Sequence, residues 1–559
     1  MTKTLHCSIL IFALLLSGCQ PSESEADTEG AVESITEESL MSHIKILSSN
    51  EYEGRATASE GEEMTINYIV DELENTGVAP GMDDGSYTQE FPLLGQTVEP
   101  SSASFVLKQN GQILNDLDFR TDFVAWPANQ EEVVDVNDAD LLYVGYGIQA
   151  PEFDWDDYKD ADVEGKVLVF KNSDPAYDEN IFGGEGRLYY GRWSYKFEKA
   201  AEMGALGAII IHTTPTAGYG WNVVSNSWSG EQFYLKSAEG EASNMTTFDS
   251  WLTESTSSEL FEAAGHDLNE MLEAADDPEF QPVPLEGITA DVDLEANYSN
   301  MSSKNVVGEI EGSDPDLMDE YIVFTAHLDH LGITTPVEGD SINNGAIDNA
   351  AGVSTLLNLA KTFKEVESGM RRSALFLFVS AEEMGLLGSK YWANNPTVHP
   401  GKISANFNMD GMQVYGPTED VVLVGYGRNS ITPVFEEYAE EAGRTVKPDP
   451  HPEQGYFYRS DHFSLAKKGI PAIFPNPGRD YIDKPENWNA VVDSVDSANY
   501  HAVSDEINEY WDPTGLVQDV RLFFRVSFDV LNLDEMMEWN EGDEFQATRE
   551  QMIEEAPEN

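Results

Sequence analysis

The fold is decided by an apolar run at residues 321–326, YIVFTA, which continues directly into the polar side chains of HLDHLG at 327–332. A second apolar run, ALFLFV at 374–379, ends in SAEE at 380–383, and residues 352–363 between the two runs have helical spacing. Strands that are apolar on both faces and alternate with helices indicate a mostly parallel sheet with helices on both sides. We therefore predict an α/β domain. Further strands are expected at 403–408, 421–424 and 471–474.

A smaller module interrupts this pattern upstream. Residues 34–79 have helical periodicity, and residues 85–135 show strands and turns without a chemical signature. Short strands and one helix, at 195–203, then predict a compact β-rich module. We divide the chain into a first part of the main domain at 34–135, a module at 136–290, the rest of the main domain at 291–540 and an acidic tail at 541–559.

The amino-terminal segment has the layout of an export signal. Lys3 precedes an apolar run at 9–16, and the residues LSGC at 16–19 resemble a bacterial lipobox. We expect residues 1–18 to be removed and Cys19 to carry lipid; a plain signal with a chance cysteine, or a short buried segment, is the alternative. Residues 19–33 are acidic and lack Lys and Arg, which predicts a solvated tether. Gln20 after the cysteine favours an outer-membrane anchor that faces the periplasm.

The charge balance excludes some partners. The chain has 559 residues, with 102 Asp and Glu against 31 Lys and Arg, and a formal net charge of -71. Phosphate repulsion disfavours a nucleic-acid partner. Both cysteines lie in the first nineteen residues, so a processed chain would have no thiol for a disulfide, a nucleophile or a metal ligand.

Metal-binding residue types follow the predicted strands. The side chains of His327 and Asp329 point the same way, because alternate residues of a strand share a face. Two histidines with several carboxylates and no cysteine favour zinc. Taken singly, each signal has a plain alternative, such as a structural histidine, a helix cap or surface charge. The other candidates are Asp348 in a glycine-flanked loop, Glu382, Glu383, Asp410 and His501.

These motifs resemble a known family. The pattern is HLD at 327–329, DNA at 348–350, EE at 382–383, NMD at 408–410 and SDH at 460–462. It resembles the bacterial di-zinc aminopeptidases related to glutamate carboxypeptidase and the transferrin receptor, over about residues 34–535. The resemblance implies a zinc-exopeptidase-like three-layer α/β/α domain with a mostly parallel mixed sheet.

The module shares in the resemblance. The stretches VGYG at 144–147, DDY at 156–158 and GKV at 165–167 resemble the smaller, β-rich protease-associated domain that is inserted in many such enzymes. It has no catalytic constellation of its own, and we expect it to shape access to the site.

The resemblance also implies a role for each site residue. Asp348 would bridge two Zn²⁺ ions, and a cis peptide is implied at Asp348–Asn349. The implied ligands of one ion are His327 and Asp410, and those of the other are Glu383 and His501. Glu382 would be the general base and Asp329 would orient His327.

Other residues near the motifs are assigned less firmly. Tyr458 is expected to donate to the oxyanion, with Tyr456, or aromatic packing alone, as the alternative. His330, Asp461 and His462 are expected to support the ligands or to be structural.

The expected activity is that of a zinc aminopeptidase. It would hydrolyse the first bond of peptides with a free amino terminus through a hydroxide that bridges the two metals. A glutamate-releasing carboxypeptidase is the main alternative, and it needs a basic cluster, for which only Arg459 and Arg479 are candidates near the site. A one-zinc glutaminyl cyclase and a non-catalytic receptor-like binding protein remain open.

Overall fold

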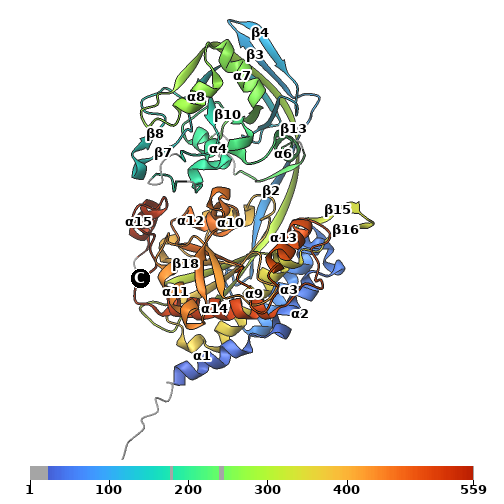
Figure 1. Ribbon diagram of the computed structural model, residues 1–559, viewed down its shortest axis with the longest axis vertical. Coiled ribbons are helices and arrows are strands. Elements are labelled where there is room, and N and C mark those ends of the chain that lie inside the picture. Colours follow the sequence, from blue (N-terminus) through green and yellow to red (C-terminus); the bar gives the residue numbers. More distant parts are fainter. Residues whose placement is uncertain (1–22, 177–180, 185, 229, 238–243, 558–559) are drawn as a thin grey trace, which may run out of the picture.

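A mixed sheet with helices on both faces forms the lower body of the molecule (Figure 1). The computed structural model describes residues 23–176, 181–184, 186–228, 230–237 and 244–557. At the centre of the sheet, β14 (Tyr321–His327) pairs in parallel with β17 (Ser373–Val379) and β18 (Ile403–Asn408). These strands lie where the apolar runs predicted them, and the predicted sheet is confirmed.

The outer strands make the sheet mixed. β21 (Ala472–Asn476) is parallel to β18, β19 (Asp420–Val424) is antiparallel to β21, and β20 (Thr445–Pro448) closes that edge. At the other edge, β13 (Val283–Ile310) runs antiparallel to β17. The carboxyl ends of β14, β17 and β18 therefore meet at one edge of the sheet, where ligands of such sheets bind.

Two layers of helices cover the sheet. On one face, Phe324, Phe376 and Phe407 of the central strands share a core with a layer of helices. On the other face, Trp392 of α10 (Leu387–Asn394) and Leu465 of α12 (His462–Ala466) pack in one cluster with Val323. This is the expected three-layer arrangement. The helices of the first face include α2 (Glu37–Leu47), α3 (Glu60–Thr76), α9 (Gly352–Glu365) and α14 (Thr514–Asn532).

Local sequence sets where these helices begin and end. The Ser59 hydroxyl accepts a hydrogen bond from the Glu62 amide and caps α3, and Gly77 ends the helix at φ 78°. Further helices of the lower body are α11 (Ile431–Glu441) and α13 (Trp488–Asn499). In the part of the chain that the structure covers, no helix is long and apolar enough to cross a membrane.

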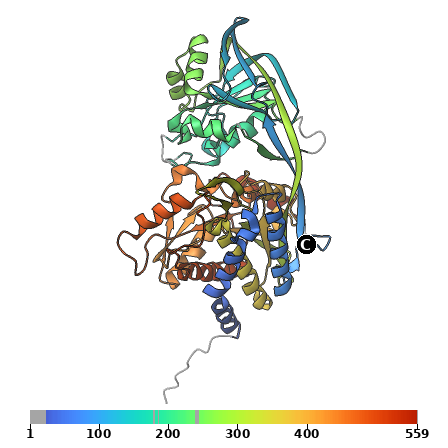
Figure 2. The same cartoon turned by 90° about the vertical axis from the view of Figure 1, so that its right-hand side faces the viewer.

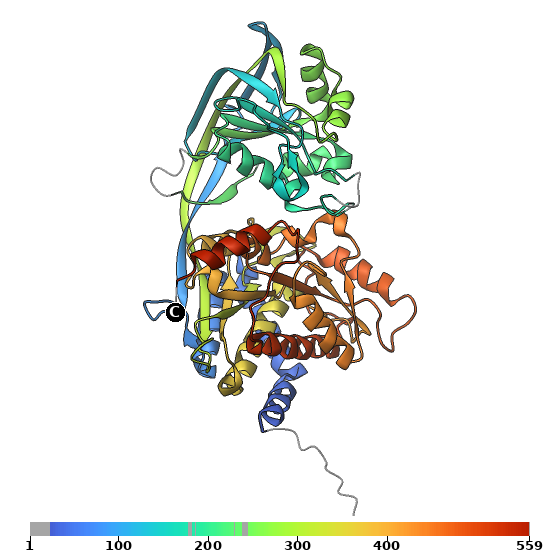
Figure 3. The ribbon, with the colours of Figure 1, turned by 90° about the vertical axis from the view of Figure 1, so that its left-hand side faces the viewer.

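A long two-stranded ribbon joins the lower body to a second, upper body. Along this ribbon β13 pairs with β2 (Thr88–Val98) from Ala296 to Val306, and Figures 2 and 3 show it at the side of the molecule. The first part of β13 belongs to the sheet of the upper body, where it pairs with β3 (Ser104–Gln109) and β6 (Val133–Tyr143). We refer to residues 99–295 as the inserted module.

The inserted module starts earlier than the sequence predicts. The expected boundary at 136 assigned residues 99–135 to the main domain, but β3, β4 (Gln112–Leu117) and β5 (Phe123–Pro127) pair within the module's sheet. The strands at 99–135 carry no chemical motif, so the sequence did not indicate that they belong to the module. The other elements are β9 (Val167–Lys171), α4 (Trp193–Glu202), β10 (Gly207–His212), β12 (Phe248–Thr253), α7 (Glu254–Ala263) and α8 (Leu268–Ala274).

Both ends of the described chain pack more closely than expected. Residues 1–18 and Cys19 lie outside the described residues, but Ala31 and Val32 of α1 (Glu23–Ser34) are buried, so this part of the expected tether belongs to the core. At the carboxyl end, α15 (Gln546–Glu555) docks through Arg549, which is 2% exposed and donates to the Ile403 carbonyl at 2.7 Å. In the residues that the structure covers, the acidic tail expected at 541–559 therefore contains a helix that Phe545 and Arg549 anchor to the body.

Candidate metal centre

The candidate ligands come from the carboxyl ends of three neighbouring parallel strands. His327 ends β14, Glu382 and Glu383 follow β17, and Asp410 follows β18. Since these strands pair side by side, their ends deliver the side chains to one place.

The loop before α9 adds Asp348. The Asp348–Asn349 peptide is cis, as the resemblance implies. The Asn349 amide donates to the carbonyls of His327 and Met409, at 3.3 and 3.0 Å, which ties this loop to the ends of β14 and β18. Asp505 holds the loop from the other side, because its carboxylate accepts from the Asp348 amide at 3.1 Å.

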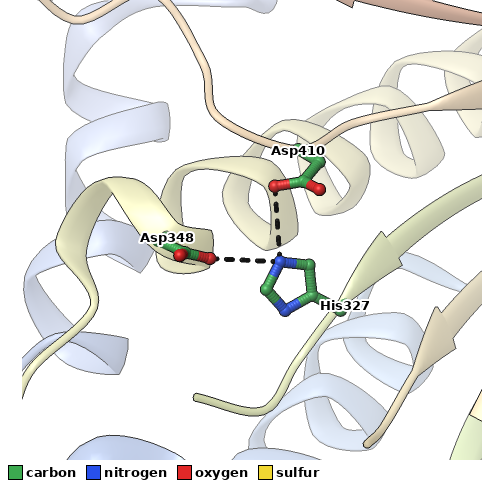
Figure 4. Close-up of side chains that lie close together, drawn as sticks. All are labelled: His327, Asp348 and Asp410. Carbon is green, nitrogen blue, oxygen red and sulfur yellow. Dashed lines mark hydrogen bonds and ion pairs between the residues drawn. The ribbon is translucent and has the colours of Figure 1, made fainter. Parts of the chain in front are cut away.

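One half of the site is formed by His327, Asp348 and Asp410. His327 Nε2 lies 3.2 Å from Asp348 Oδ1 and 3.4 Å from Asp410 Oδ1, as Figure 4 shows. The second oxygen of Asp410 accepts a hydrogen bond from the Ser460 hydroxyl at 2.6 Å. Ser460 thus fixes the carboxylate and leaves one oxygen directed at His327.

The other half uses the second oxygen of Asp348. His501 Nε2 lies 3.3 Å from Asp348 Oδ2 and 3.2 Å from Glu383 Oε2. His330 Nδ1 contacts the other oxygen of Glu383 at 2.7 Å and lies 4.0 Å from Asp348 Oδ2. Asp348 therefore has one oxygen in each half, as expected of a bridging ligand.

The distances fit divalent ions such as zinc. Two ligand atoms on a tetrahedral zinc ion with bonds of about 2.0–2.1 Å lie about 3.3–3.4 Å apart. The separations involving His327 and His501 fall close to that value. The His330–Glu383 contact is shorter and has hydrogen-bond length, which suits a supporting role for His330.

The electrostatics also favour a bound cation. Burial opposes protonation of His327, but the charges of Asp410 and Glu382 raise its pKa well above its usual value. Burial likewise opposes ionisation of Asp348, but hydrogen bonds from His327 and His501 hold its pKa well below the usual range. The centre thus attracts positive charge, which protons provide when no metal is bound.

Glu382, the expected base, lies beside the candidate ligands, in the field of His327, Asp410 and Glu383. Burial first, and then the charges of Asp410, Asp461 and Glu383, raise its pKa well above the usual value. A carboxylate with a raised pKa is a better proton acceptor, as general-base catalysis requires.

Asp329 connects the base to a ligand. Its carboxylate accepts from the Glu382 amide at 3.1 Å and from the Thr57 hydroxyl at 3.2 Å, and it lies 3.9 Å from His327 Nδ1. The closer partner of that ring nitrogen is the Asp329 backbone carbonyl, at 3.2 Å. Asp329 therefore contacts His327 mainly through its backbone and positions Glu382 through its side chain.

Tyr458 is engaged elsewhere. Its buried hydroxyl donates to Glu544 at 2.6 Å and accepts from Arg428 at 3.2 Å. These contacts agree with the aromatic-packing alternative rather than with an oxyanion donor. Tyr456 is 41% exposed and lies under the Arg459 guanidinium.

The remaining motif residues, His462 and Asp461, are fully buried. The ring of His462 lies between Phe457 and Phe474, and burial lowers its pKa to about 3, which fits a structural histidine. Burial raises the pKa of Asp461 to about 7.

Sequence reasoning missed Tyr500. Its ring stacks on that of His501, with centroids 3.9 Å apart, and the side chain is 68% exposed. Burial of part of the ring, and the charges of Asp348, Glu383 and Glu382, raise its pKa, so the phenol keeps its proton. Its position directly before a candidate ligand was the one available signal.

Comparisons with known proteins point to the same part of the chain. Residues 305–523 match the model of Peptidase family M28, and this span contains all five candidate ligands.

Among curated proteins, leucine aminopeptidase 2 of Trichophyton rubrum is 26% identical over 223 residues, which cover 38% of this chain and 41% of that protein. Aminopeptidase YwaD of Bacillus subtilis is 31% identical over 117 residues, or 20% of this chain and 22% of that one. The chain spans about two fifths of the length of the leucine aminopeptidases that it matches.

Among solved structures, the aminopeptidase from Aneurinibacillus sp. strain AM-1 is similar over 90% of this chain and 95% of its own, with 19% identity and a TM-score of 0.47. A peptidase M28 precursor from Shewanella amazonensis covers 92% and 99%, with 18% identity and a TM-score of 0.41.

Proposed function

We propose, on the premise that residues 305–523 form a domain of peptidase family M28, that this protein is a zinc-dependent aminopeptidase. The observation that carries the proposal is the bridging geometry of Asp348, which offers one oxygen to His327 and the other to His501. Such a pair of half-sites suits two ions rather than one. His327, Asp348 and Asp410 would hold the first ion, and Asp348, Glu383 and His501 the second.

Bound zinc supplies Lewis-acid polarisation of the scissile carbonyl and lowers the pKa of an attacking water. Glu382 accepts the proton of that water and returns it to the leaving amine. The Asp329 carboxylate holds Glu382 in place by accepting a hydrogen bond from the Glu382 backbone amide. The exposed phenol of Tyr500 beside His501 is the donor best placed to stabilise the oxyanion of the substrate.

The alternative functions fit less well. A receptor-like binding protein predicts gaps in the ligand set, and a one-zinc cyclase needs only half of it. All five candidate ligands lie in contact with one another, and Glu382 lies in the field of His327 and Asp410, which favours the two-metal hypothesis. Arg479, one of the two cations considered for a carboxypeptidase, is bound to Asp493 and Asn489.

We also propose that the protein is exported and anchored by lipid on Cys19, facing the periplasm from the outer membrane. The support is the basic, apolar and small-residue order of the first nineteen residues. Metabolic labelling with a radioactive fatty acid tests this, because Cys19→Ser should abolish incorporation and Cys7→Ser should not.

Hydrolysis of leucine p-nitroanilide beside its N-acetylated form tests the proposed activity. We expect cleavage of the free-amine substrate alone, loss on chelation, recovery with zinc, and a decrease of about 10²–10⁴-fold in kcat/KM for Glu382→Gln. Glu365→Gln, an exposed glutamate at the end of α9, is the matched control. Cleavage of the acetylated substrate, or full activity in Glu382→Gln, would contradict the proposal.

A further inference from the structure

Three arginines from the two bodies of the molecule gather at their junction. Arg187 and Arg192 flank a short helical turn of the inserted module, η3 (Tyr189–Gly191), and Arg459 follows η9 (Tyr456–Tyr458) of the lower body. The Arg187 amide donates to the Pro452 carbonyl at 3.1 Å, so the module's loop lies directly on the loop that leads to Arg459.

Two of these arginines have no acidic partner among the described residues. Arg192 and Arg459 form neither an ion pair nor a side-chain hydrogen bond there, although acids outnumber bases by 102 to 31. Among the described residues, the Arg187 guanidinium donates to the Thr216 carbonyl, at 3.1 Å. Six other arginines bind carboxylates: Arg371, Arg372, Arg428, Arg444, Arg479 and Arg525. Among the described residues, Arg55, Arg521 and Arg549 instead donate to backbone carbonyls, and Arg120 donates to the Asn226 amide oxygen.

The cluster is close enough for mutual repulsion. Burial first, and then the charges of Arg459 and Arg187, lower the pKa of Arg192 to about 10. The hydroxyls of Tyr219 and Tyr189 raise the pKa of Arg192 and so oppose this decrease. An anion bound at this place would relieve that repulsion.

The arginines remain available to a ligand. Arg459 is exposed and its guanidinium rests on the ring of Tyr456, while Arg192 and Arg187 are partly exposed. The charge of Arg187 lowers the pKa of Asp174, as does the charge of Lys196. The Asp174 carboxylate accepts a hydrogen bond from the Leu188 amide, at 2.9 Å. Among the described residues, Arg192 and Arg459 are therefore the two arginines of the cluster whose side chains have no hydrogen-bonding partner.

The cluster lies next to the metal centre along the chain. Arg459 directly precedes Ser460, whose hydroxyl binds the ligand Asp410. One extended residue spans about 3.3–3.6 Å, so the second and third residues of a peptide whose amino end is at the metals come within reach of a long arginine side chain.

We propose that Arg192 and Arg459, flanked by Arg187, form a carboxylate-binding subsite for the downstream part of a short peptide. The carboxylate is either the terminal carboxyl group or an acidic side chain, and guanidinium groups recognise both in the same way. The proposal rests on the proposed aminopeptidase function and adds to it a substrate class: short peptides with a free carboxyl end, or peptides acidic after the first residue.

Matched substrates separate the two sources of the carboxylate. Leu-Gly-Gly is compared with its carboxyl-terminal amide, and Leu-Glu-Gly amide with Leu-Gln-Gly amide. The wild-type enzyme should prefer the carboxylate in at least one pair by about 10-fold or more in kcat/KM, as charged hydrogen bonds allow. The preferred pair identifies the source.

The variants Arg192→Gln and Arg459→Gln should each bring that ratio close to one. Arg192→Lys, which keeps the charge but not the planar fork, should recover part of it. The control Arg479→Gln, a surface arginine paired with Asp493, should keep the wild-type ratio. Because the readout is a ratio within one preparation, a partly misfolded variant does not distort it.

The two proposals fail in different ways. A wild-type ratio near one in both pairs, or a ratio that persists in both glutamine variants, overturns the subsite while the aminopeptidase stands. Failure of the wild-type enzyme to cleave leucine p-nitroanilide overturns the proposed function and the subsite with it.

Discussion

The metal centre and the inserted module both bury ionisable side chains, but they balance the charge differently. In the centre, none of the carboxylates of Asp348, Glu382, Glu383 and Asp410 forms an ion pair with a described lysine or arginine. In the module, the fully buried Lys196 lies in the field of Asp157 and Asp174.

The charged groups of the module's cluster find their hydrogen-bond partners inside the module. Lys196 Nζ donates to the Tyr190 carbonyl at 2.7 Å, and Asp157 accepts from the Ile148 amide and the Trp155 indole. Burial lowers the pKa of Lys196 to about 7, and the two aspartates oppose that decrease. A balanced cluster is a structural feature, whereas an excess of carboxylates with histidines in reach needs a cation from outside.

The largest effect is expected from Asp348→Asn. The amide keeps the shape of the side chain but removes the charge that both half-sites share, so we expect kcat/KM on leucine p-nitroanilide to decrease by about 10⁴-fold or more. Asp319→Asn, on an exposed loop, is the control. Activity within tenfold of wild type would show that the two half-sites do not depend on Asp348.

The next effect distinguishes the two histidines beside Glu383. His501→Ala should remove a ligand and lower kcat/KM by about 10²–10³-fold, whereas His330→Ala should cost about 10-fold, as is typical of a residue that supports a ligand. Metal content per chain, measured by mass spectrometry, should fall toward one in the first variant and stay at two in the second. The reverse order would assign the ligand role to His330.

In the module, Lys196→Met should affect stability rather than catalysis. The substitution removes the buried cation near Asp157 and Asp174. Removing one partner of a set of buried charges lowers the free energy of unfolding by about 3 kcal/mol. We expect a lower Tm in calorimetry with unchanged kcat per folded molecule. Lys166→Met, which breaks a surface pair with Asp162, should change little. An equal loss of kcat would link this cluster to the site.

A smaller, pH-dependent effect is expected at Asp249 on β12. Burial raises the pKa of this carboxyl to about 7, and the hydrogen bond that it accepts from the Thr246 hydroxyl opposes part of that increase. The folded state therefore prefers the protonated form. The stability from this group is fully present below pH of about 4 and is lost as the pH rises through about 7.

Asp249→Asn should remove this dependence. Between pH 5 and pH 8, we expect the free energy of unfolding of the variant to increase by about 2 kcal/mol relative to that of the wild type. Urea unfolding, followed by the fluorescence of the module, measures this difference. Parallel pH profiles for the two proteins would show that Asp249 does not titrate in this range.

The sequence predicted the sheet, and the edge of it at which most of the candidate ligands meet, for the same reason. Four of the five candidate ligands end or follow a buried strand or lie just before a helix, so a local pattern indicates their place in the fold, whereas His501 follows the end of α13. His327, Glu383 and Asp410 meet because parallel strands end at one edge.

What the sequence did not predict depends on contacts between distant segments. The start of the module at 99 depends on β13 serving two sheets, and the docking of the carboxyl end depends on Arg549 reaching the Ile403 carbonyl. The position of Tyr458 depends on Arg428 and Glu544, far from it in the chain. The arginine cluster likewise joins residues from two bodies, and no local pattern marks it.

Calorimetric titration of zinc into the metal-stripped protein tests most directly whether the unbalanced carboxylates form a two-metal centre. We predict two ions per folded wild-type chain and none bound tightly by Asp348→Asn, with proton release as His327 and His501 lose their protons. A single ion in the wild type, or two ions in the variant, would contradict the account.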